Sequence, residues 1–331
     1  EACARAAEYS SRHQGLSLIV QVNGRRMFEH HAPGVDMERP HDVASGTKSF
    51  AGVLAAAAAA DGLLQFDEPV VETIEEWRAD PVKSRITIRQ LLHLVSGLAG
   101  GSKPGHIPEY EEALQAPSVS EPGARFHYAN APFQVFGEIM RRKLRALVED
   151  PLVYLQARVL DAIGLRVGRW RRGRDGQPSW ASGASLAARE WVKLGELVRE
   201  EGRQSDRELI PAASLRECFQ GSADNPAYGL AWWLNAPLPP GRRPVLRQAT
   251  LGLDDLWADP WVPRDLVYAA GAAKQRLYVS RKEGWVAVRQ AGGVHAALAH
   301  GERSPFSDRE FLSRLLDAEV APTTAAVPDG H

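Results

Sequence analysis

The chain has 331 residues, enough for one large domain or two coupled domains with a substantial core. Its 40 basic and 41 acidic residues give a formal net charge of −1, so charge provides no footprint for nucleic acid or an anionic membrane surface. No stretch reaches the ~18 apolar residues that a membrane-spanning helix needs. Length, charge and hydropathy therefore favour a globular protein without the charge pattern of a nucleic-acid-binding protein and without a membrane span.

Cysteine usage and metal motifs narrow the chemistry further. Cys3 and Cys218 are too few for a disulfide framework, although one bridge between them stays open. Neither C-x-x-C nor H-E-x-x-H occurs, so we predict no metal and no organic cofactor. The chain begins with Glu1, as a processed mature form would, and we expect a periplasmic or secreted protein, with a cytoplasmic location as the alternative. The oligomeric state stays open.

The N-terminal part predicts a helix, a hairpin and a second helix. Residues 2–13 have helical composition, and Leu16–Val22 and Arg25–Glu29 read as strands joined by the turn signal Asn23-Gly24. The next helix follows Ser45, carries an alanine run and ends at Asp61-Gly62, where glycine suits a helix C-terminus.

Strand signals return only near the C-terminus. Helix starts near Thr87 and Ala131 mark a helical middle, and the late segments are strands at Leu266–Tyr268, Arg276–Ser280 and Trp285–Arg289, then a helix at Phe311–Leu316. This order predicts an α/β fold of the α+β type, with an antiparallel sheet formed by both chain ends and flanked by helices. The predicted sheet domain comprises residues 1–62 and 226–318, with a mainly helical domain, 63–225, inserted. The tail, 319–331, is predicted to be disordered.

The motif Ser45-x-x-Lys48 opens an apolar helical segment. Residues i and i+3 share a helix face, so the lysine amine can lie beside the serine hydroxyl. This is the only S-x-x-K in the chain. The helix start also offers free backbone N–H groups to a developing oxyanion. The spacing therefore predicts a nucleophile, Ser45, with a base one turn away.

Apolar neighbours predict that Lys48 is buried. Burial favours the neutral amine and lowers the pKa of a lysine, and a helix N-terminus acts in the same direction. We therefore expect Lys48 to act as a general base near neutral pH.

A third group is predicted at Tyr128-x-Asn130, which follows a turn and precedes the helix at Pro132. A tyrosine hydroxyl can relay a proton, and an asparagine amide can both donate to and accept from a substrate. Tyr128 is therefore the candidate that protonates the leaving group, and Asn130 is the candidate that orients the substrate. His127, which directly precedes Tyr128, is interpreted as structural, because Lys48 already supplies a base.

Together these motifs resemble the serine β-lactamase and penicillin-recognising superfamily. The resemblance is nearest to its class C-like branch, which includes carboxylesterases, D-aminopeptidases and 6-aminohexanoate-dimer hydrolases. It extends in family order over about residues 15 to 318, through Ser45–Phe50, Asp61–Leu64, Phe66–Val70, Ile86–Leu92, Ser96–Leu98, Tyr228–Trp233 and Ala269–Gln275. The resemblance implies a β-lactamase-like fold and an acyl-enzyme mechanism, with water activation by Tyr128 and Lys48.

The third family motif departs from its usual form. Relatives carry Lys-Thr-Gly or His-Ser-Gly where this chain has Ala269-Ala270-Gly271, so the cationic or hydroxyl side chain is missing. That group helps penicillin-recognising members to hold the substrate carboxylate, and its loss favours substrates without that anion. By resemblance, the N–H groups of Ser45 and Ala272 form the oxyanion hole. Gly271 allows a close backbone approach. Ala273 and Lys274 stand where relatives often carry glycine, and they would narrow the pocket, or Lys274 would place a charge at its rim.

The predicted substrate contacts are Asn130, Trp180, Trp233, Gly271 and Gln275. The predicted function is a serine hydrolase acting on short-acyl esters, small amides or oligoamides through an acyl-enzyme. The alternatives are a β-lactamase or penicillin-binding-type protein, and a non-hydrolytic sensor or scaffold of the same fold.

Overall fold

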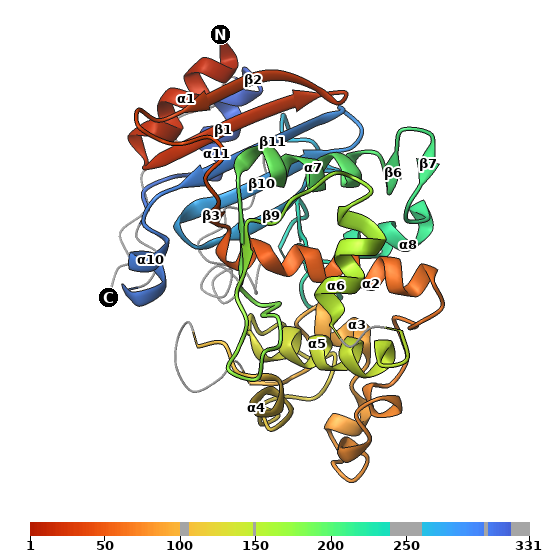
Figure 1. The fold of residues 1–331 in the computed structure, drawn as a ribbon. Coiled ribbons are helices and arrows are strands. Elements are labelled where there is room, and N and C mark those ends of the chain that lie inside the picture. The colour runs from red at the N-terminus through yellow and green to blue at the C-terminus, as the bar shows by residue number, and fades with distance from the viewer. Residues whose placement is uncertain (100–105, 148–149, 239–259, 301–303, 319–331) are drawn as a thin grey trace, which may run out of the picture.

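A central antiparallel sheet joins the two ends of the chain in this computed structural model (Figure 1). The structure describes residues 1–99, 106–147, 150–238, 260–300 and 304–318. Within these ranges the sheet has six strands in the order β2-β1-β11-β10-β9-β8. Their bounds, in that order, are Arg25–His31, Gly15–Val22, Trp285–Ala291, Gln275–Ser280, Val267–Gly271 and Trp233–Leu234. The predicted sheet of both chain ends is therefore confirmed. The predicted tail, 319–331, lies outside the described residues.

The hairpin between β1 and β2 has the predicted turn. Asn23 and Gly24 have φ angles of 48° and 75°, and a two-residue hairpin turn of this hand requires positive φ at both positions. β1 pairs with β11 on its other edge, with Ile19 opposite Val288. β1 therefore joins the N-terminal hairpin to the C-terminal strands, and β2 forms the edge of the sheet.

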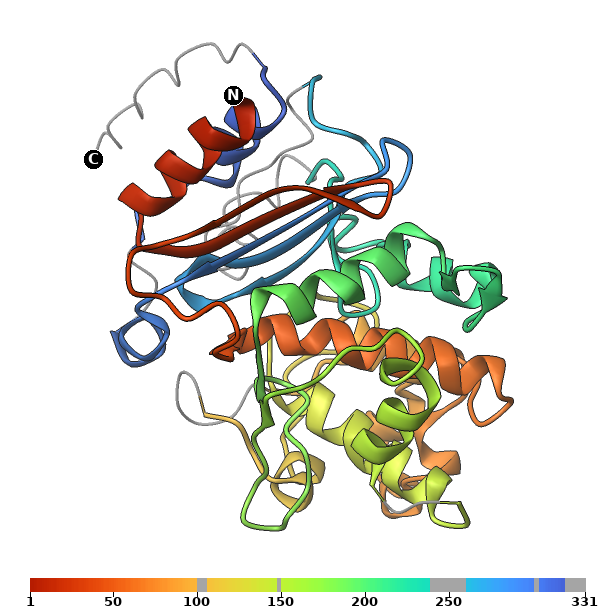
Figure 2. The same ribbon diagram turned by 45° about the horizontal axis from the view of Figure 1, so that its top comes forward.

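Helices cover both faces of this sheet (Figure 2). α1 (Ala2–Arg12) and α11 (Asp308–Leu315) pack together on one face. α7 (Ala188–Arg199) packs against β10 and β11 on the opposite face. Gly195 makes this approach possible, because a Cβ there would lie 2.4 Å from Cγ1 of Val286. α7 lies within residues 63–225, the segment predicted as an inserted domain, and it packs directly against strands of the sheet.

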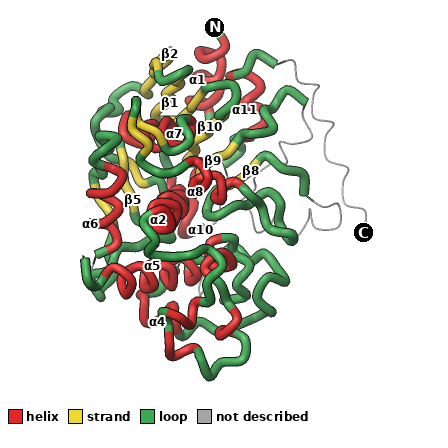
Figure 3. The backbone as a smooth tube through the Cα atoms, turned by 90° about the vertical axis from the view of Figure 1, so that its right-hand side faces the viewer, coloured by secondary structure: helices red, strands yellow, loops and turns green. Residues whose placement is uncertain are grey.

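A helical layer lies beyond α7 and is organised around α2 (Lys48–Ala60), which is buried over most of its length (Figure 3). Small side chains let neighbours come close. A Cβ at Gly52 would lie 2.4 Å from the carbonyl oxygen of Leu230. The other α-helices of this layer among the described residues are α3 (Ile88–Leu92), α4 (Tyr110–Leu114), α5 (Ala131–Leu144), α6 (Pro151–Leu155) and α8 (Ala212–Arg216). α10 (Val294–His300) lies instead beside the turn between β9 and β10. The short strands are β3 (His41–Asp42), β4 (Arg169–Trp170), β5 (Ala184–Leu186), β6 (Arg203–Gln204) and β7 (Arg207–Glu208).

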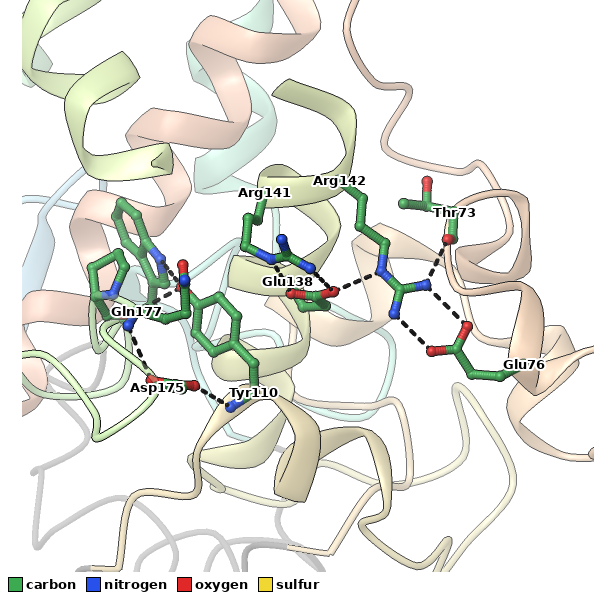
Figure 4. Close-up of polar contacts among 10 residues, drawn as sticks. Thr73, Glu76, Tyr110, Glu138, Arg141, Arg142, Asp175 and Gln177 are labelled. Atoms are coloured by element: carbon green, nitrogen blue, oxygen red, sulfur yellow. Dashed lines mark hydrogen bonds and ion pairs between the residues drawn. The ribbon is translucent and has the colours of Figure 1, made fainter. Parts of the chain in front are cut away.

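Ion pairs fix α5 within this layer (Figure 4). The Glu138 carboxylate accepts hydrogen bonds from Arg141 at 2.7 Å and from Arg142 at 2.6 Å. Arg142 continues to the carboxylate of Glu76, at 2.7 Å, and to the carbonyl oxygen of Thr73. These contacts tie the second half of α5 to the segment that carries Thr73 and Glu76.

Candidate active site

Ser45 lies in a 3-10 turn, Ala44–Thr47, that leads into α2. Ala44 has a φ of 48°, a left-handed conformation that is uncommon outside glycine. Gly46 lies against Trp191, whose ring would be 2.8 Å from a Cβ at that position. The backbone is therefore tightly bent, and the Ser45 side chain remains partly exposed while its neighbours are buried.

The hydrogen-bond acceptors around the amine of Lys48 are uncharged groups and not carboxylates. Its Nζ lies 3.2 Å from Oγ of Ser45, 3.0 Å from Oδ1 of Asn130 and 2.8 Å from the carbonyl oxygen of Ala181. The residue is 1% exposed. Burial lowers the pKa of Lys48 to about 7, because desolvation disfavours the ammonium form. A substantial fraction of this amine is therefore neutral at physiological pH.

Thr47 connects the Ser45 turn to the segment that carries the Ala181 carbonyl. Its hydroxyl donates to the carbonyl oxygen of Ala44 at 2.7 Å and accepts from the N–H groups of Gly183, at 3.0 Å, and Ala184, at 3.1 Å. This role of Thr47 was not predicted. The only sequence feature that could have indicated it is the hydroxyl residue inside the S-x-x-K motif. The contact of Lys48 with the backbone carbonyl of Ala181 has no sequence signal, because every residue has such a carbonyl.

Tyr128 lies beside both groups. Its ring centroid is 4.9 Å from Nζ of Lys48, and the ring stacks on Trp233 with centroids 5.8 Å apart. Burial raises the pKa of Tyr128 to about 12, and a hydrogen bond with the Ser45 side chain opposes part of that rise. The phenol therefore keeps its proton at neutral pH, next to the hydroxyl of Ser45.

Asn130 uses both ends of its amide within the protein. Oδ1 accepts from Lys48, and Nδ2 donates to the carbonyl oxygen of His106 at 2.8 Å. This pattern orients the lysine amine, and any substrate contact of Asn130 has to share these atoms.

The end of β9 closes on the segment before Ser45. A Cβ at Gly271 would lie 2.1 Å from the carbonyl oxygen of Val43, so only glycine permits this approach. Ala272 follows directly, at the start of the turn to β10, and is 8% exposed. The structure thus brings together Ser45, Lys48, Tyr128, Asn130 and the Gly271-Ala272 peptide. Trp233, predicted as a substrate contact, is 3% exposed and packs on the ring of Tyr128.

Two predicted substrate contacts are corrected by their burial. Trp180 is 0% exposed, and its indole Nε1 donates to the hydroxyl of Tyr110 at 2.9 Å, so it offers no surface to a substrate. Gln275 is also 0% exposed, and its amide exchanges two hydrogen bonds with the backbone of Ala291, at the end of β11. Both side chains had polar or aromatic groups that suited a pocket, but tertiary packing uses them elsewhere.

Lys274 also differs from expectation. It is 4% exposed, and its ammonium lies 3.9 Å from the carboxylate of Asp308, so its charge is not at the rim of a pocket. His127, which was interpreted as structural, is exposed.

Within the described ranges no cluster of His, Cys, Asp and Glu side chains could hold a metal ion. Cys3 and Cys218 are both free thiols. No described helix has the length and apolar character needed to cross a bilayer.

Comparisons with known proteins agree with this geometry at the level of fold. The family described as Beta-lactamase matches residues 1–289. The class C beta lactamase from Rhodobacter sphaeroides superposes with a TM-score of 0.66 at 18% identity, over 95% of this chain and 97% of that one. EstCE1, a hydrolase with promiscuous acyltransferase activity, gives 0.68 at 16% identity, over 96% and 97%. D-alanine carboxypeptidase AmpC from Burkholderia cenocepacia gives 0.65 at 15%, over 96% and 97%.

No curated protein sequence matches the chain. The solved structures are too distant in sequence to transfer an activity, and they establish the fold. The family match covers most of the chain, and it confirms both the resemblance seen in the motifs and the predicted fold class. The chain belongs to the beta-lactamase family, whose members are generally serine hydrolases.

Proposed function

We propose that this protein is a serine hydrolase that cleaves esters or small amides through an acyl-enzyme on Ser45. One observation carries the proposal: a buried amine with a pKa of about 7, that of Lys48, lies 3.2 Å from the hydroxyl of Ser45. An amine with that pKa can accept a proton near neutral pH, which is what a serine nucleophile requires.

The proposed reaction has two halves. Oγ of Ser45 attacks the carbonyl carbon while its proton passes to Nζ of Lys48. The tetrahedral oxyanion accepts hydrogen bonds from the N–H groups of Ser45 and Ala272, each worth about 3–4 kcal/mol of barrier. The bond to the leaving group then breaks as the hydroxyl of Tyr128 gives a proton to the leaving atom. The proton held by Lys48 then passes to Tyr128. In the second half, water attacks the acyl carbon as its proton passes to Nζ of Lys48. The bond from the acyl carbon to Oγ of Ser45 then breaks, and Oγ takes that proton back.

The third motif favours esters, and amides with no carboxylate close to the scissile bond, over β-lactams, whose carboxylate lies next to the ring. Ala269 and Ala270 place methyl groups where relatives carry a cation or a hydroxyl, and the Lys274 ammonium lies toward Asp308 instead. A substrate carboxylate would have no side-chain partner from these positions. Short-acyl esters, small amides and aminohexanoate-type oligomers are therefore the proposed class.

The test compares wild type with Ser45→Ala on three substrates: a p-nitrophenyl ester, an aminohexanoate dimer and a chromogenic cephalosporin. We expect turnover of the ester or the dimer that disappears in Ser45→Ala while the circular dichroism spectrum is unchanged. The proposal is wrong if the variant retains wild-type turnover. Faster cleavage of the cephalosporin than of the other two would reverse the substrate preference.

A second measurement separates an enzyme from a slow-acylating sensor. Intact mass is recorded over time after addition of the p-nitrophenyl ester. A hydrolase shows an acyl adduct on wild type that decays as product accumulates. An adduct that persists indicates a sensor, and Ser45→Ala should show none in either case.

A further inference from the structure

The turn between β9 and β10 has an unfavourable backbone. Ala273 and Lys274 adopt φ angles of 57° and 58°, a region that residues with a side chain seldom occupy. Two successive residues in this region cost free energy, so other contacts must hold the turn in place. The turn begins at the peptide between Gly271 and Ala272, whose N–H is the proposed oxyanion donor.

Arg276 supplies one set of these contacts. It is 1% exposed, and its Nη1 donates to the carbonyl oxygens of Gly271, at 3.3 Å, and Gln275, at 3.0 Å. Its other nitrogens bind the carboxylate of Asp308, Nε at 2.6 Å and Nη2 at 3.1 Å. The hydroxyl of Tyr278 donates to the same carboxylate at 2.5 Å. α11 thus fixes the guanidinium, and the guanidinium binds both ends of the turn.

Arg289 supplies the second set. It is the partner of Arg276 across the β10–β11 pair and is 0% exposed. Its Nη1 donates to the carbonyl oxygen of Lys274 at 2.7 Å. Two buried cations therefore bind the carbonyls of Gly271, Lys274 and Gln275 from the side of the sheet that carries α1 and α11.

We propose that Arg276, held by Asp308, is a positioning residue that orients and strengthens the Ala272 N–H as an oxyanion donor. The carbonyl of Gly271 and the N–H of Ala272 belong to the same peptide group. A cation that binds the carbonyl oxygen polarises that group and makes its N–H a better donor to a developing negative charge. This inference rests on the proposed function.

Charge supports the same assignment. The third motif of this chain has no cation of its own, and Arg276 is the cross-strand partner of Ala270 in that motif. Burial raises the pKa of Tyr128, and the positive charge of Arg276 opposes that rise. The field of Arg276 thus reaches the proposed proton donor as well as the oxyanion peptide.

The test uses a p-nitrophenyl ester and the matched thionoester, in which sulfur replaces the carbonyl oxygen. Sulfur is a weak hydrogen-bond acceptor, so a thionoester gains less from an oxyanion hole. The key variant is Arg276→Met combined with Asp308→Asn, which removes both charges of the Arg276–Asp308 pair and leaves an acceptor for Tyr278. Asp308→Asn alone is measured beside it, because the Lys274 ammonium, 3.9 Å from Asp308, loses its carboxylate in both variants. Arg276→Lys keeps the cation but lacks the fork of donors that spans Asp308 and the two carbonyls. Arg199→Met is the control, because it removes a mostly buried arginine paired with Glu196 on α7, away from the turn.

For the double variant we expect kcat on the ester to fall about tenfold with KM little changed. The fall is smaller than the roughly 10²–10³ that loss of a whole oxyanion donor costs, because the Ala272 N–H is weakened and not removed. The ester-to-thionoester ratio of kcat/KM should fall by the same factor. Arg276→Lys should regain thermal stability without regaining the ratio, and Arg199→Met should keep the wild-type ratio.

The inference is overturned if ester and thionoester rates fall together, if neither falls, or if Arg276→Lys restores the ratio. Loss of folding in the double variant leaves Arg276→Lys as the deciding protein. Wild type and Ser45→Ala are assayed in parallel. If wild type shows no Ser45-dependent hydrolysis, the proposed function fails and this inference fails with it. Ser45-dependent hydrolysis with an unchanged ratio in the variants overturns this inference alone.

Discussion

At the scale of single residues, the central feature is an amine that burial makes basic at the right pH. Lys48 has three neutral acceptors around Nζ and no carboxylate among its hydrogen-bond partners in the described chain. A carboxylate would stabilise the ammonium form and raise the pKa of the lysine. Neutral acceptors orient the amine without that effect, so desolvation determines its pKa.

The rate of ester hydrolysis should depend on the protonation of Lys48. Because the base form is required and the pKa is about 7, kcat/KM is expected to rise from pH 5.5 to about pH 8 and then level off. Tyr128, with a pKa of about 12, remains a proton donor throughout this range. A pH profile of wild type checks this. A flat profile across pH 6–8 would exclude Lys48 as the base.

The same burial should cost stability. In the folded protein the pKa of Lys48 is about 7, below its ordinary value of 10.5, so the unfolded state binds more protons between these two values. The cost is complete below pH 7 and declines by about 1.4 kcal/mol per pH unit as the pH rises toward 10.5. Lys48→Met should therefore unfold at higher urea than wild type at pH 6, with a smaller difference at pH 9. Lys282→Met, on an exposed turn, is the control. A pH-independent difference would contradict the burial argument.

At the scale of elements, glycines decide how closely the strands and helices approach the site. Gly271 lets the end of β9 meet the segment before Ser45, and Gly195 lets α7 meet β10 and β11. The two positions differ in what a side chain would contact. At Gly271 it meets a backbone carbonyl that cannot move alone, whereas at Gly195 it meets the methyl groups of Val286 and Leu277.

These two glycines predict different outcomes for the same substitution. Gly271→Ala should push β9 away from Ser45 and lower kcat by about 10² or more, because the oxyanion donors move apart. Gly195→Ala should lower the free energy of unfolding by about 1–3 kcal/mol through overpacking, with a smaller loss of kcat. Ester kinetics and urea unfolding of both variants provide the comparison. Equal loss of kcat in the two would mean that β9 is not specifically placed for catalysis.

At the scale of the whole molecule, the sheet and the helical layer share one core. A single cluster of buried residues extends from Ala6 in α1 to Leu315 in α11 and includes α2 and α5. α2 begins at the site, so the residue that holds the proposed base is also part of the contact between layers. Stability of the termini and geometry of the site are therefore coupled.

This coupling predicts a long-range effect of a C-terminal substitution. Phe311 is 0% exposed and stacks on Tyr278 with ring centroids 5.7 Å apart. Phe311→Ala should lower the free energy of unfolding by about 3–5 kcal/mol. Because the core is shared, hydrogen exchange in α5 and in β1 should report the same urea midpoint, shifted equally in the variant. Separate midpoints for the two elements would show that the layers fold independently.

Local sequence determined much of this protein. Turn chemistry and helical spacing depend only on neighbours in the chain. They account for the Asn23-Gly24 hairpin, the β10–β11 strands, the capping box of Thr87 and Gln90 at the start of α3, and the position of Ser45 beside Lys48. The family resemblance followed from the same short motifs. The predicted catalytic roles of Ser45, Lys48 and Tyr128 stay predictions until activity is measured.

Only the tertiary structure decided which polar side chains remain available to a substrate. Trp180 and Gln275 have the chemistry of pocket residues, yet burial and hydrogen bonds to Tyr110 and Ala291 use them in the core. The role of Arg276 also depends on the tertiary structure. Arg276 lies within a strand pattern, and nothing near it in the sequence indicates that it pairs with Asp308, 32 positions later in the chain. Desolvation and long-range pairing depend on what the rest of the chain places around a residue, and spacing along the sequence does not contain that information.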